Sequence, residues 1–438
     1  MNHAQTTFSG PPRQPRSNYN RTVSQSVQTQ SRRAAKAQRG LDAERIAAHR
    51  QPFLCDSATQ RLCVEELYDW RKKECLAVLK THKGTILMTI LTLSLALCTG
   101  GCSGATETPT PVPIPPSTSI SASQAADPFD QNRRLGRGVN LGNALEAPSE
   151  GEWGVTLREE YFQLIADAGF DAVRIPVRWS AHAASAPPYT IDPSFFERVD
   201  WAVNQALSRG LLAVINVHHY EEIFQNPAQH RERFLALWEQ IAGHYQDYPP
   251  DLLFEILNEP NTALTANVWN PLLADALRVV RRTNPDRNVV VSSTEWSGVQ
   301  ALGYLQLPDD DRHLIVTVHY YLPFQFTHQG AEWVSGSEPW LGTTWPGTPA
   351  QKQAVTDDFD RVAAWAEKNN RPVYLGEFGA YSKADIESRA RWTDFIARQA
   401  EQRGFSWAYW EFCAGFGVYN PSTRQWNEPL LTALLPAP

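Results

Sequence analysis

The sequence predicts an α/β protein, a (β/α)8 TIM barrel preceded by a disordered leader, an export signal and a linker rich in Pro, Ser and Thr. Eight short apolar runs alternate with amphipathic stretches from about residue 127 onward. Such alternation is typical of parallel strands joined by helices, and eight units in one domain favour a closed barrel over an open sheet. No glycine-rich phosphate loop follows any run, which counts against a nucleotide-binding fold.

Residues 1–126 are expected to contribute nothing to the barrel. Residues 1–83 are rich in Gln, Ser, Arg and Asn and carry about eight excess positive charges, so we expect a disordered basic leader. Residues 84–102 combine a basic flank, a short apolar core and a Gly-Gly-Cys ending, which predicts an export signal with Cys102 as a lipidated residue. Residues 103–126 are rich in Pro, Ser and Thr, which favours an extended tether.

The position of this export signal in the chain bears on where translation starts. Such signals normally begin within a few residues of the initiator, so we expect translation to start downstream, near Val78 or Leu79. The basic leader could otherwise bind nucleic acid or a membrane surface, but its low periodicity favours an untranslated or disordered segment. We expect an exported monomer, either secreted or held at the outer membrane or in the periplasm by a lipid anchor.

The eight predicted strands are rich in Val, Ile, Leu and Phe, as strands buried on both faces are. They lie at residues 138–141, 172–175, 212–217, 252–257, 288–291, 314–318, 373–375 and 406–410. Apolar residues at helical spacing fill most of the intervals. The predicted helices lie at residues 156–168, 193–208, 230–245, 271–283, 356–369 and 386–403. The barrel domain is therefore expected to span residues 127–438.

Composition restricts the function of this domain. The net charge of -7 hides about fifteen excess negative charges after residue 83, which argues against nucleic acid as a ligand. The chain has 15 Trp and 14 Tyr, and such rings serve either as core or as flat platforms for sugars. Cys413 is the only cysteine of the predicted barrel, so we expect no internal disulfide. No residue pattern indicates a metal or another cofactor.

Two glutamates stand at the ends of apolar runs, Glu259 after residues 252–257 and Glu377 after residues 373–375. An unpaired buried carboxylate is costly, and a run of Leu, Ile, Val and Phe offers it no solvent. One such glutamate alone could equally well cap a helix or pair with an arginine. Two at equivalent positions predict a reacting pair.

Other polar residues lie at the predicted strand ends, and in a barrel these ends meet at one cavity. For any single His or Trp a packing role is the better interpretation, but the set as a whole predicts an active site. The set comprises Asn143, Glu146, Arg174, Trp179, His218, His219, Asn258, His319, Tyr321, Trp410 and Glu411.

Residues 127–435 resemble glycoside hydrolase family 5, the retaining β-glycanases that carry their acid at strand four and their nucleophile at strand seven. The motifs of the resemblance lie at residues 173–179, 216–219, 257–260, 318–321, 376–379 and 408–411. Residues 143–148 and 326–333 look like the compact endoglucanase branch, and they add His328 and Trp333 to the expected substrate-binding residues. The resemblance implies a (β/α)8 barrel that needs no cofactor and acts on a β-glucan polysaccharide.

Glycosidic cleavage explains the types of residue in the set. An acid protonates the leaving oxygen, and in a retaining enzyme a second carboxylate about 5 to 5.5 Å away attacks the anomeric carbon. Glu259 is expected to be the acid/base, its pKa raised by the nearby Glu377, which is expected to be the nucleophile. Arg174 and Tyr321 are expected to aim Glu377, and Asn258 to hold the sugar 2-hydroxyl.

The remaining residues have expected roles as well. His218 and His319 would orient the carboxylates or bind sugar hydroxyls, and Trp410 would stack beneath the sugar being cleaved. The residues expected to bind substrate are Asn143, Glu146, His219, His328, Trp333, Trp410 and Glu411. The tryptophans expected in the walls of the groove are Trp179, Trp333, Trp340 and Trp345.

The predicted function is a retaining endo-β-1,4-glucanase acting on cellulose-type or mixed-linkage glucans. An endo-β-1,4-mannanase or a xyloglucanase would use the same residues, and the sequence leaves the polymer open. A non-catalytic carbohydrate-binding barrel would have no need of both Glu259 and Glu377. A metal hydrolase built on His218 and His219 is disfavoured, because adjacent residues of a strand point to opposite faces and the HExxH spacing is absent.

Overall fold

The computed structural model describes residues 127–437. The predicted leader at residues 1–83, the export segment at residues 84–102 with Cys102, and the tether at residues 103–126 lie outside the described residues. Among the described residues, no helix combines the length and the apolar character needed to span a bilayer.

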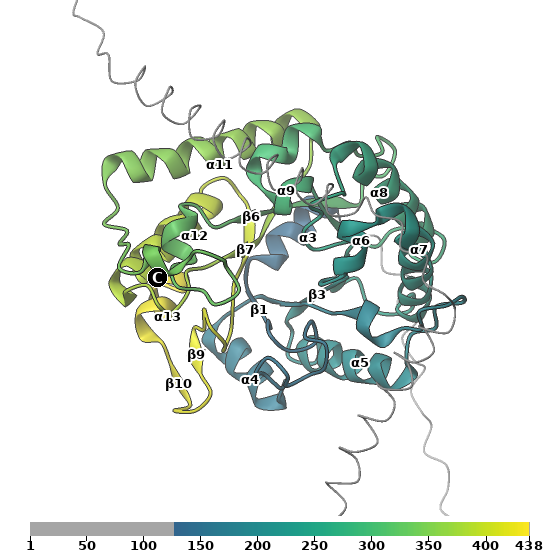
Figure 1. Ribbon diagram of the computed structural model, residues 1–438, viewed down its shortest axis with the longest axis horizontal. Helices are drawn as coiled ribbons and strands as arrows, with labels where there is room; N and C mark the ends of the chain where they lie inside the picture. Colours follow the sequence, from purple (N-terminus) through teal and green to yellow (C-terminus); the bar gives the residue numbers. More distant parts are fainter. Residues whose placement is uncertain (1–126, 438) are drawn as a thin grey trace, which may run out of the picture. The chain divides into compact units, whose positions relative to one another are not determined.

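Eight parallel strands close into a barrel in sequence order, with β8 hydrogen-bonded to β1. The strands are β1 (Arg137–Asn140), β2 (Ala172–Ile175), β3 (Leu212–Asn216), β4 (Leu252–Glu255), β5 (Val289–Ser292), β6 (Leu314–Tyr320), β7 (Val373–Phe378) and β8 (Ser406–Tyr409). Each predicted strand overlaps one of them, and the predicted (β/α)8 fold is confirmed. A hairpin of β9 (Tyr419–Asn420) and β10 (Gln425–Trp426) lies outside the barrel, beside α4 in Figure 1.

Helices form an outer ring around the strands, and Figure 1 shows them surrounding the strands at the centre of the view. The six longest correspond to the six predicted helices: α4 (Glu159–Ala168), α5 (Pro193–Leu207), α7 (Pro227–His244), α8 (Ala266–Arg281), α11 (Pro349–Asn369) and α12 (Ile386–Glu401). Shorter helices complete the loops: α6 (Glu221–Gln225), α9 (Thr294–Ser297), α10 (Phe324–Thr327), α13 (Glu428–Leu434), η1 (Trp179–His182), η2 (Val299–Tyr304) and η3 (Glu338–Trp340). Between β5 and β6 the connection is made by α9 and η2 rather than by a long helix.

Helix α3 (Pro128–Leu135) precedes the barrel and was not predicted, because its eight residues are mostly polar. Asp127 caps it, since its carboxylate accepts hydrogen bonds from two backbone amides of the first turn. The Asn132 amide donates to the Val373 carbonyl (3.0 Å) and accepts from the Ser406 hydroxyl (2.7 Å). These are the first residues of β7 and β8, so α3 covers the amino-terminal end of the barrel, as Figure 1 shows.

Two apolar layers lie on the two faces of the strands. Neighbouring residues alternate between them, as when Ala172 points into the barrel and Val173 toward the helices. The inner layer comprises Leu135, Ala172, Leu212, Val214, Leu253, Val290, Ile315, Tyr374 and Ala408. Because both faces are covered, the strands are mostly apolar, which is why the sequence shows them as nearly continuous runs, and their buried polar residues, such as Arg174 in β2 and Glu255 in β4, stand out.

Strand β7 contains a bulge that bears on the site. The register against β6 shifts, so that Val318 pairs with Leu375 whereas His319 pairs with Glu377, and Gly376 is the additional residue between them. Glu377 therefore lies within β7, not after a strand ending at Leu375 as the sequence suggested. Glu259 differs as well, since β4 ends at Glu255 and Glu259 stands in the loop beyond it.

Candidate active site

A cavity of about 1370 Å³ opens at the carboxyl ends of the strands. It is the place where a (β/α)8 barrel positions residues from several strands together. Twelve of the predicted site residues line it: Asn143, Glu146, His218, His219, Asn258, Glu259, His319, Tyr321, His328, Trp333, Glu377 and Trp410. Arg174 and Glu411 do not line it, because each is fully buried behind the cavity wall.

Glu377 is held from two sides. The Arg174 guanidinium donates from Nη1 to Glu377 Oε1 (2.7 Å), and the Tyr321 hydroxyl donates to Glu377 Oε2 (2.9 Å). Burial and the adjacent carboxylate keep the pKa of Tyr321 well above its usual range, so the phenol remains a donor. The predicted contacts of Arg174 and Tyr321 with Glu377 are present in the structure, and both donors suit a carboxylate aimed at a substrate.

Arg174 also has partners that the sequence analysis missed. It donates to both carboxylate oxygens of Glu255, from Nε (2.6 Å) and Nη2 (2.8 Å), and to the side-chain oxygens of Asn140 (2.8 Å) and Asn258 (2.6 Å). Arg174 and Glu255 are both fully buried. Glu255 could have been suspected, because a charged residue inside the apolar run at residues 252–257 needs a buried partner.

Glu259 faces Glu377 across the cavity. One ligating atom from each of Glu259, His319 and Glu377 can be chosen such that all three lie within 4.8 Å of one another. The Nδ1 atom of His319 lies 2.7 Å from Glu259 Oε1 and 3.6 Å from Glu377 Oε2. The two carboxylates thus approach closely enough for double displacement, whose carboxyl groups stand about 5 to 5.5 Å apart.

Burial raises the pKa of Glu259 to about 7, while Arg174 and His219 oppose the shift. The direction agrees with the expectation, but its cause differs. The sequence predicts that the charge of Glu377 raises this pKa, whereas burial is the largest cause of the shift. Glu259 is therefore protonated below about pH 7, as a general acid must be.

The histidines are held neutral. Burial keeps the pKa of His218 well below its usual range and lowers that of His319. His218 Nδ1 accepts from the Asn216 side-chain amide (3.0 Å), and its ring lies nearly parallel to Trp410 with centroids 5.8 Å apart. His218 thus orients Trp410 at the cavity floor, where a Cβ on Gly142 would approach the indole to 3.0 Å.

Glu146 and Glu411 organise loops. Glu411 accepts hydrogen bonds from the backbone amides of Cys413 (2.7 Å), Ala414 (2.8 Å) and Phe416 (3.1 Å), and its fully buried carboxylate does not reach the cavity. Its expected role as a substrate-binding residue is therefore wrong: it shapes the loop after β8. Glu146 accepts from the amides of Asn143 and Ala144, although it also borders the cavity.

The walls differ from the prediction in their aromatic residues. Trp179 and Trp345 are fully buried and cannot stack on a substrate, and Trp340 does not line the cavity. Of the four predicted wall tryptophans, Trp333 alone lines it, with 60% of its surface exposed.

Two exposed wall tryptophans were missed. Trp153 and Trp296 line the cavity with exposures of 39% and 58%. Trp296 stands on a turn in which Glu295, Trp296 and Ser297 all have left-handed backbone angles, with φ of 55° to 56°. This turn could not be predicted from the residue types, because left-handed backbone is uncommon outside glycine.

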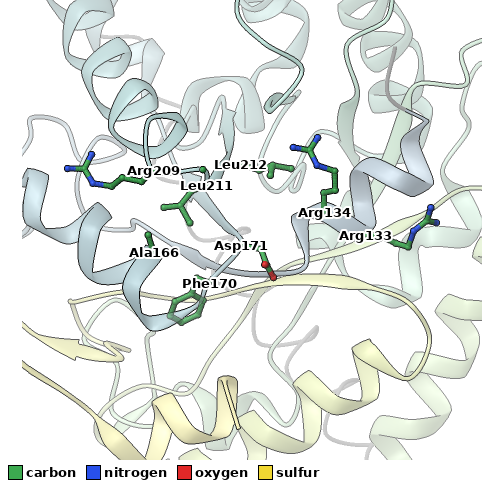
Figure 2. A pocket seen from close by; sticks show the side chains of 9 residues that line it. Arg133, Arg134, Ala166, Phe170, Asp171, Arg209, Leu211 and Leu212 are labelled. Carbon is green, nitrogen blue, oxygen red and sulfur yellow. The ribbon is translucent and has the colours of Figure 1, made fainter. Parts of the chain in front are cut away.

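Metal binding has one candidate set among the described residues, Glu259, His319 and Glu377. It fits a cation poorly, because the Arg174 guanidinium already donates to Glu377 and supplies the positive charge there. A second hollow, shown in Figure 2, lies at the amino-terminal end of β2 and β3. Its arginines point apart and pair with carboxylates: Arg133 with Asp130, Arg134 with Asp251 and Arg209 with Glu159.

Comparison with known proteins agrees with this geometry. Residues 136–415 match the model of the cellulase family, glycosyl hydrolase family 5. The chain belongs to glycosyl hydrolase family 5. This family 5 domain is 40% identical over 320 residues to Endoglucanase H of Acetivibrio thermocellus, and the aligned region covers 72% of this chain and 34% of that protein. The chain thus spans about a third of the length of that relative.

Solved structures of family 5 enzymes superpose on the barrel. Cel5A of Thermotoga maritima in complex with mannotriose is 54% identical, with a TM-score of 0.70 over 70% of this chain and all of that one. The same enzyme in complex with cellobiose is 55% identical, with a TM-score of 0.70 and the same coverage. The resemblance to glycoside hydrolase family 5 that the motifs indicate is confirmed.

Proposed function

We propose that this protein is a retaining endo-β-1,4-glucanase with Glu259 as acid/base and Glu377 as nucleophile. The observation that supports it most is that the two carboxylates have different surroundings. Glu377 receives hydrogen bonds from Arg174 and Tyr321, which suit an ionised nucleophile, whereas burial raises the pKa of Glu259 to about 7.

The reaction follows from these positions. Glu259 gives its proton to the glycosidic oxygen while Glu377 attacks the anomeric carbon, so the leaving chain departs as an alcohol and a glycosyl ester forms on Glu377. Glu259, now a carboxylate, takes a proton from water, which attacks the same carbon and releases Glu377. Asn258 borders the cavity beside Glu259, where its amide can hold the sugar 2-hydroxyl.

The cavity supports internal cleavage of a polymer. It is open to solvent, and exposed aromatic side chains stand in separate wall segments, Trp153 after β1, Trp296 after β5 and Trp333 after β6. Aromatic faces bind sugar rings, so several sugars can be held on both sides of the cleaved bond. Mannan is a second candidate substrate, because the related Thermotoga maritima Cel5A is described in complex with both mannotriose and cellobiose.

The substrate is tested with a form of residues 127–438 on carboxymethylcellulose, barley β-glucan, xyloglucan and glucomannan. We expect the highest rate on a β-1,4-glucan and an early fall in viscosity relative to the reducing ends released. Release of single sugars without early loss of viscosity would contradict internal cleavage. A higher rate on glucomannan than on either glucan would make the mannanase the better assignment.

The two roles are tested by Glu259→Gln and Glu377→Gln, each expected to lower kcat by several orders of magnitude, on the order of 10⁴. Added azide should partly restore the turnover of Glu377→Ala and give a glycosyl azide of inverted configuration. With Glu259→Ala and an activated aryl glycoside, azide should give a glycosyl azide of retained configuration. Reversed products would exchange the roles. Glu295→Gln, which changes an exposed glutamate of the same cavity, is the matched control and should keep kcat near the parental value. Unchanged turnover in both catalytic variants would favour a binding barrel.

We also propose export and a lipid anchor at Cys102, on the strength of the signal-like segment at residues 84–102. Membrane fractionation of the native cells, with Cys102→Ala as the comparison, tests it. Release or misprocessing of the variant is expected, and unchanged partitioning would leave secretion, or retention of the apolar stretch, as the better account.

A further inference from the structure

The imidazole of His319 is bonded on one side. Its Nδ1 atom lies 2.7 Å from Glu259 Oε1, whereas its Nε2 atom is buried and has no hydrogen-bond partner within the part of the chain that the structure describes. The hydroxyl of Thr317, two residues earlier in β6, is also buried and without a partner there. Buried polar atoms without partners are costly and uncommon, so two near each other call for a common explanation.

Gly376 shows how near these two atoms are. A Cβ placed on Gly376 would stand 2.6 Å from Thr317 Oγ1 and 3.1 Å from His319 Nε2, so both atoms border the same point in the barrel. Residues two apart in a strand point to the same face, which places both side chains on the inner face of β6. A small rotation of the Thr317 side chain, or one bridging water, would join the two groups.

We propose that Thr317 is a positioning residue whose hydroxyl is the hydrogen-bond partner of His319 Nε2 and thereby fixes the imidazole against Glu259. This role rests on the proposed function, since it matters only if Glu259 cycles between acid and base. The Thr317 side chain touches no substrate, because it does not line the cavity.

A hydroxyl suits this position because Glu259 changes its protonation state during the reaction. Burial lowers the pKa of His319, so the ring is neutral, with a proton on one nitrogen and a lone pair on the other. When Glu259 is a carboxylate, Nδ1–H donates to it and Nε2 accepts from the Thr317 hydroxyl. When Glu259 is protonated and donates to Nδ1, the Nε2–H group donates to the Thr317 oxygen. A hydroxyl can serve in both ways, whereas a methyl group can serve in neither.

The charged and titratable groups around this pair come from several strands. Four of them face it from within the barrel: Glu377 and Tyr374 of β7, Arg174 of β2 and Glu255 of β4. Tyr321 follows β6. After β3, His218 faces His319, and His219 and Glu221 face Glu259. Replacement of Thr317 alters none of them. A change in the titration of Glu259 would therefore report the lost partner of His319.

The test compares Thr317→Val, which keeps the shape without the hydroxyl, with Thr317→Ser, which keeps the hydroxyl. For Thr317→Val we expect kcat to fall about tenfold, the rate equivalent of one lost hydrogen bond, with KM nearly unchanged. The alkaline limb of the kcat/KM profile should move to higher pH, because a loosened Nδ1–H stabilises the Glu259 carboxylate less. Thr317→Ser should restore both the rate and the profile.

Thr393→Val is the matched control, since Thr393 in α12 also has a fully buried and unpartnered hydroxyl but lies outside the cavity. It should leave the pH profile unchanged. The proposal is overturned if Thr317→Val keeps the parental profile, if Thr317→Ser behaves like Thr317→Val, or if Thr393→Val shifts the profile equally. Should Thr317→Val fail to fold, Thr317→Ala against Thr317→Ser decides in the same way.

The ¹⁵N resonances of the histidine rings give a readout without substrate, with His319 assigned through His319→Asn. Thr317→Val should shift the Nε2 resonance of His319, and an unshifted resonance would overturn the contact. If the parental enzyme hydrolyses no β-glycan, the proposed function fails, and the ring spectra still decide on Thr317.

Discussion

One residue, Arg174, holds several buried side chains of the site in place. Its guanidinium donates to Glu377, Glu255 and two asparagines, and only a planar group with five donors can do so. An ammonium group has three donors and no fixed fork. A lysine at this position would leave several buried acceptors without partners.

We therefore expect Arg174→Lys to lower kcat by about 100-fold and the free energy of unfolding by about 3 kcal/mol. Kinetics on an aryl cellobioside and urea denaturation measure the two effects. Arg198→Lys is the matched control, since Arg198 makes the same two-pronged contact with Glu150 (2.8 Å and 2.8 Å) outside the cavity. Equal loss of kcat in both variants would mean that Arg174 acts through stability alone.

Prediction from the sequence worked best for residues whose chemistry is costly to bury. Glu259 and Glu377 were found because a carboxylate among apolar residues demands a reason, and the same argument applied to Glu255 would have found it as well. Trp179 and Trp345 were misplaced because a tryptophan satisfies a core as well as a sugar platform. Only the path of the loops, which cannot be predicted from the sequence, distinguishes a core tryptophan from one that stacks on a sugar.

The bulge in β7 is the element that positions Glu377. Gly376 is the additional residue, and any side chain there would collide with Thr317 and His319 on the neighbouring strand. A glycine inside an apolar run is a sign of a bulge or of a close approach. The sequence predicts the strand but not this shift of register, because a glycine alone does not distinguish a bulge from a close approach of another side chain.

We expect Gly376→Ala to lower kcat at least tenfold and to lower the melting temperature, because the added methyl would lie 2.6 Å from the Thr317 oxygen. Gly243→Ala in α7 is the matched control, because a Cβ there meets nothing within 4 Å. That variant should be active and as stable as the parent or slightly more so, since alanine favours a helix. A Gly376→Ala variant with parental kinetics would show that the bulge tolerates a side chain.

The elements themselves were largely predictable, and the exceptions have physical reasons. Eight strands and six helices followed from hydrophobic periodicity. Helix α3 was missed because few of its residues are apolar, and the turn at Glu295 was missed because three non-glycine residues adopt left-handed backbone. Both are decided by tertiary contacts, such as the Ser297 hydroxyl donating to the Asn258 carbonyl (2.9 Å).

At the scale of the whole domain, stability should depend on pH through two opposing sets of buried groups. Burial raises the pKa of Glu146, Glu259 and Glu411 to about 7. Their contribution to the free energy of unfolding of the domain therefore falls as pH rises from about 4.5 through 7. Burial lowers the pKa of His182, His218, His319 and His328. Their contribution to the free energy of unfolding of the domain therefore increases as pH rises toward 6.5. The two trends oppose each other below about pH 6.5, and only the first acts above it.

We therefore expect the melting temperature of the residue 127–438 form to be highest between about pH 5 and 6.5 and to fall toward pH 8. Calorimetry across pH 4 to 8 measures this. Glu411→Gln should lower the melting temperature but flatten the decline above pH 6.5. A melting temperature that rises from pH 6.5 to 8 would contradict the prediction and would mean that the backbone amides around Glu411 outweigh its burial.

Helix α3 has a practical consequence for how this domain can be attached to a support. The described chain begins with α3, whose Asn132 contacts the first residues of β7 and β8, while the cavity opens at the opposite ends of the strands. A domain coupled through its first residue to a bead or an electrode would therefore turn its groove outward, toward the suspended polymer. Immobilisation through the face that carries Trp296 would press the groove against the support.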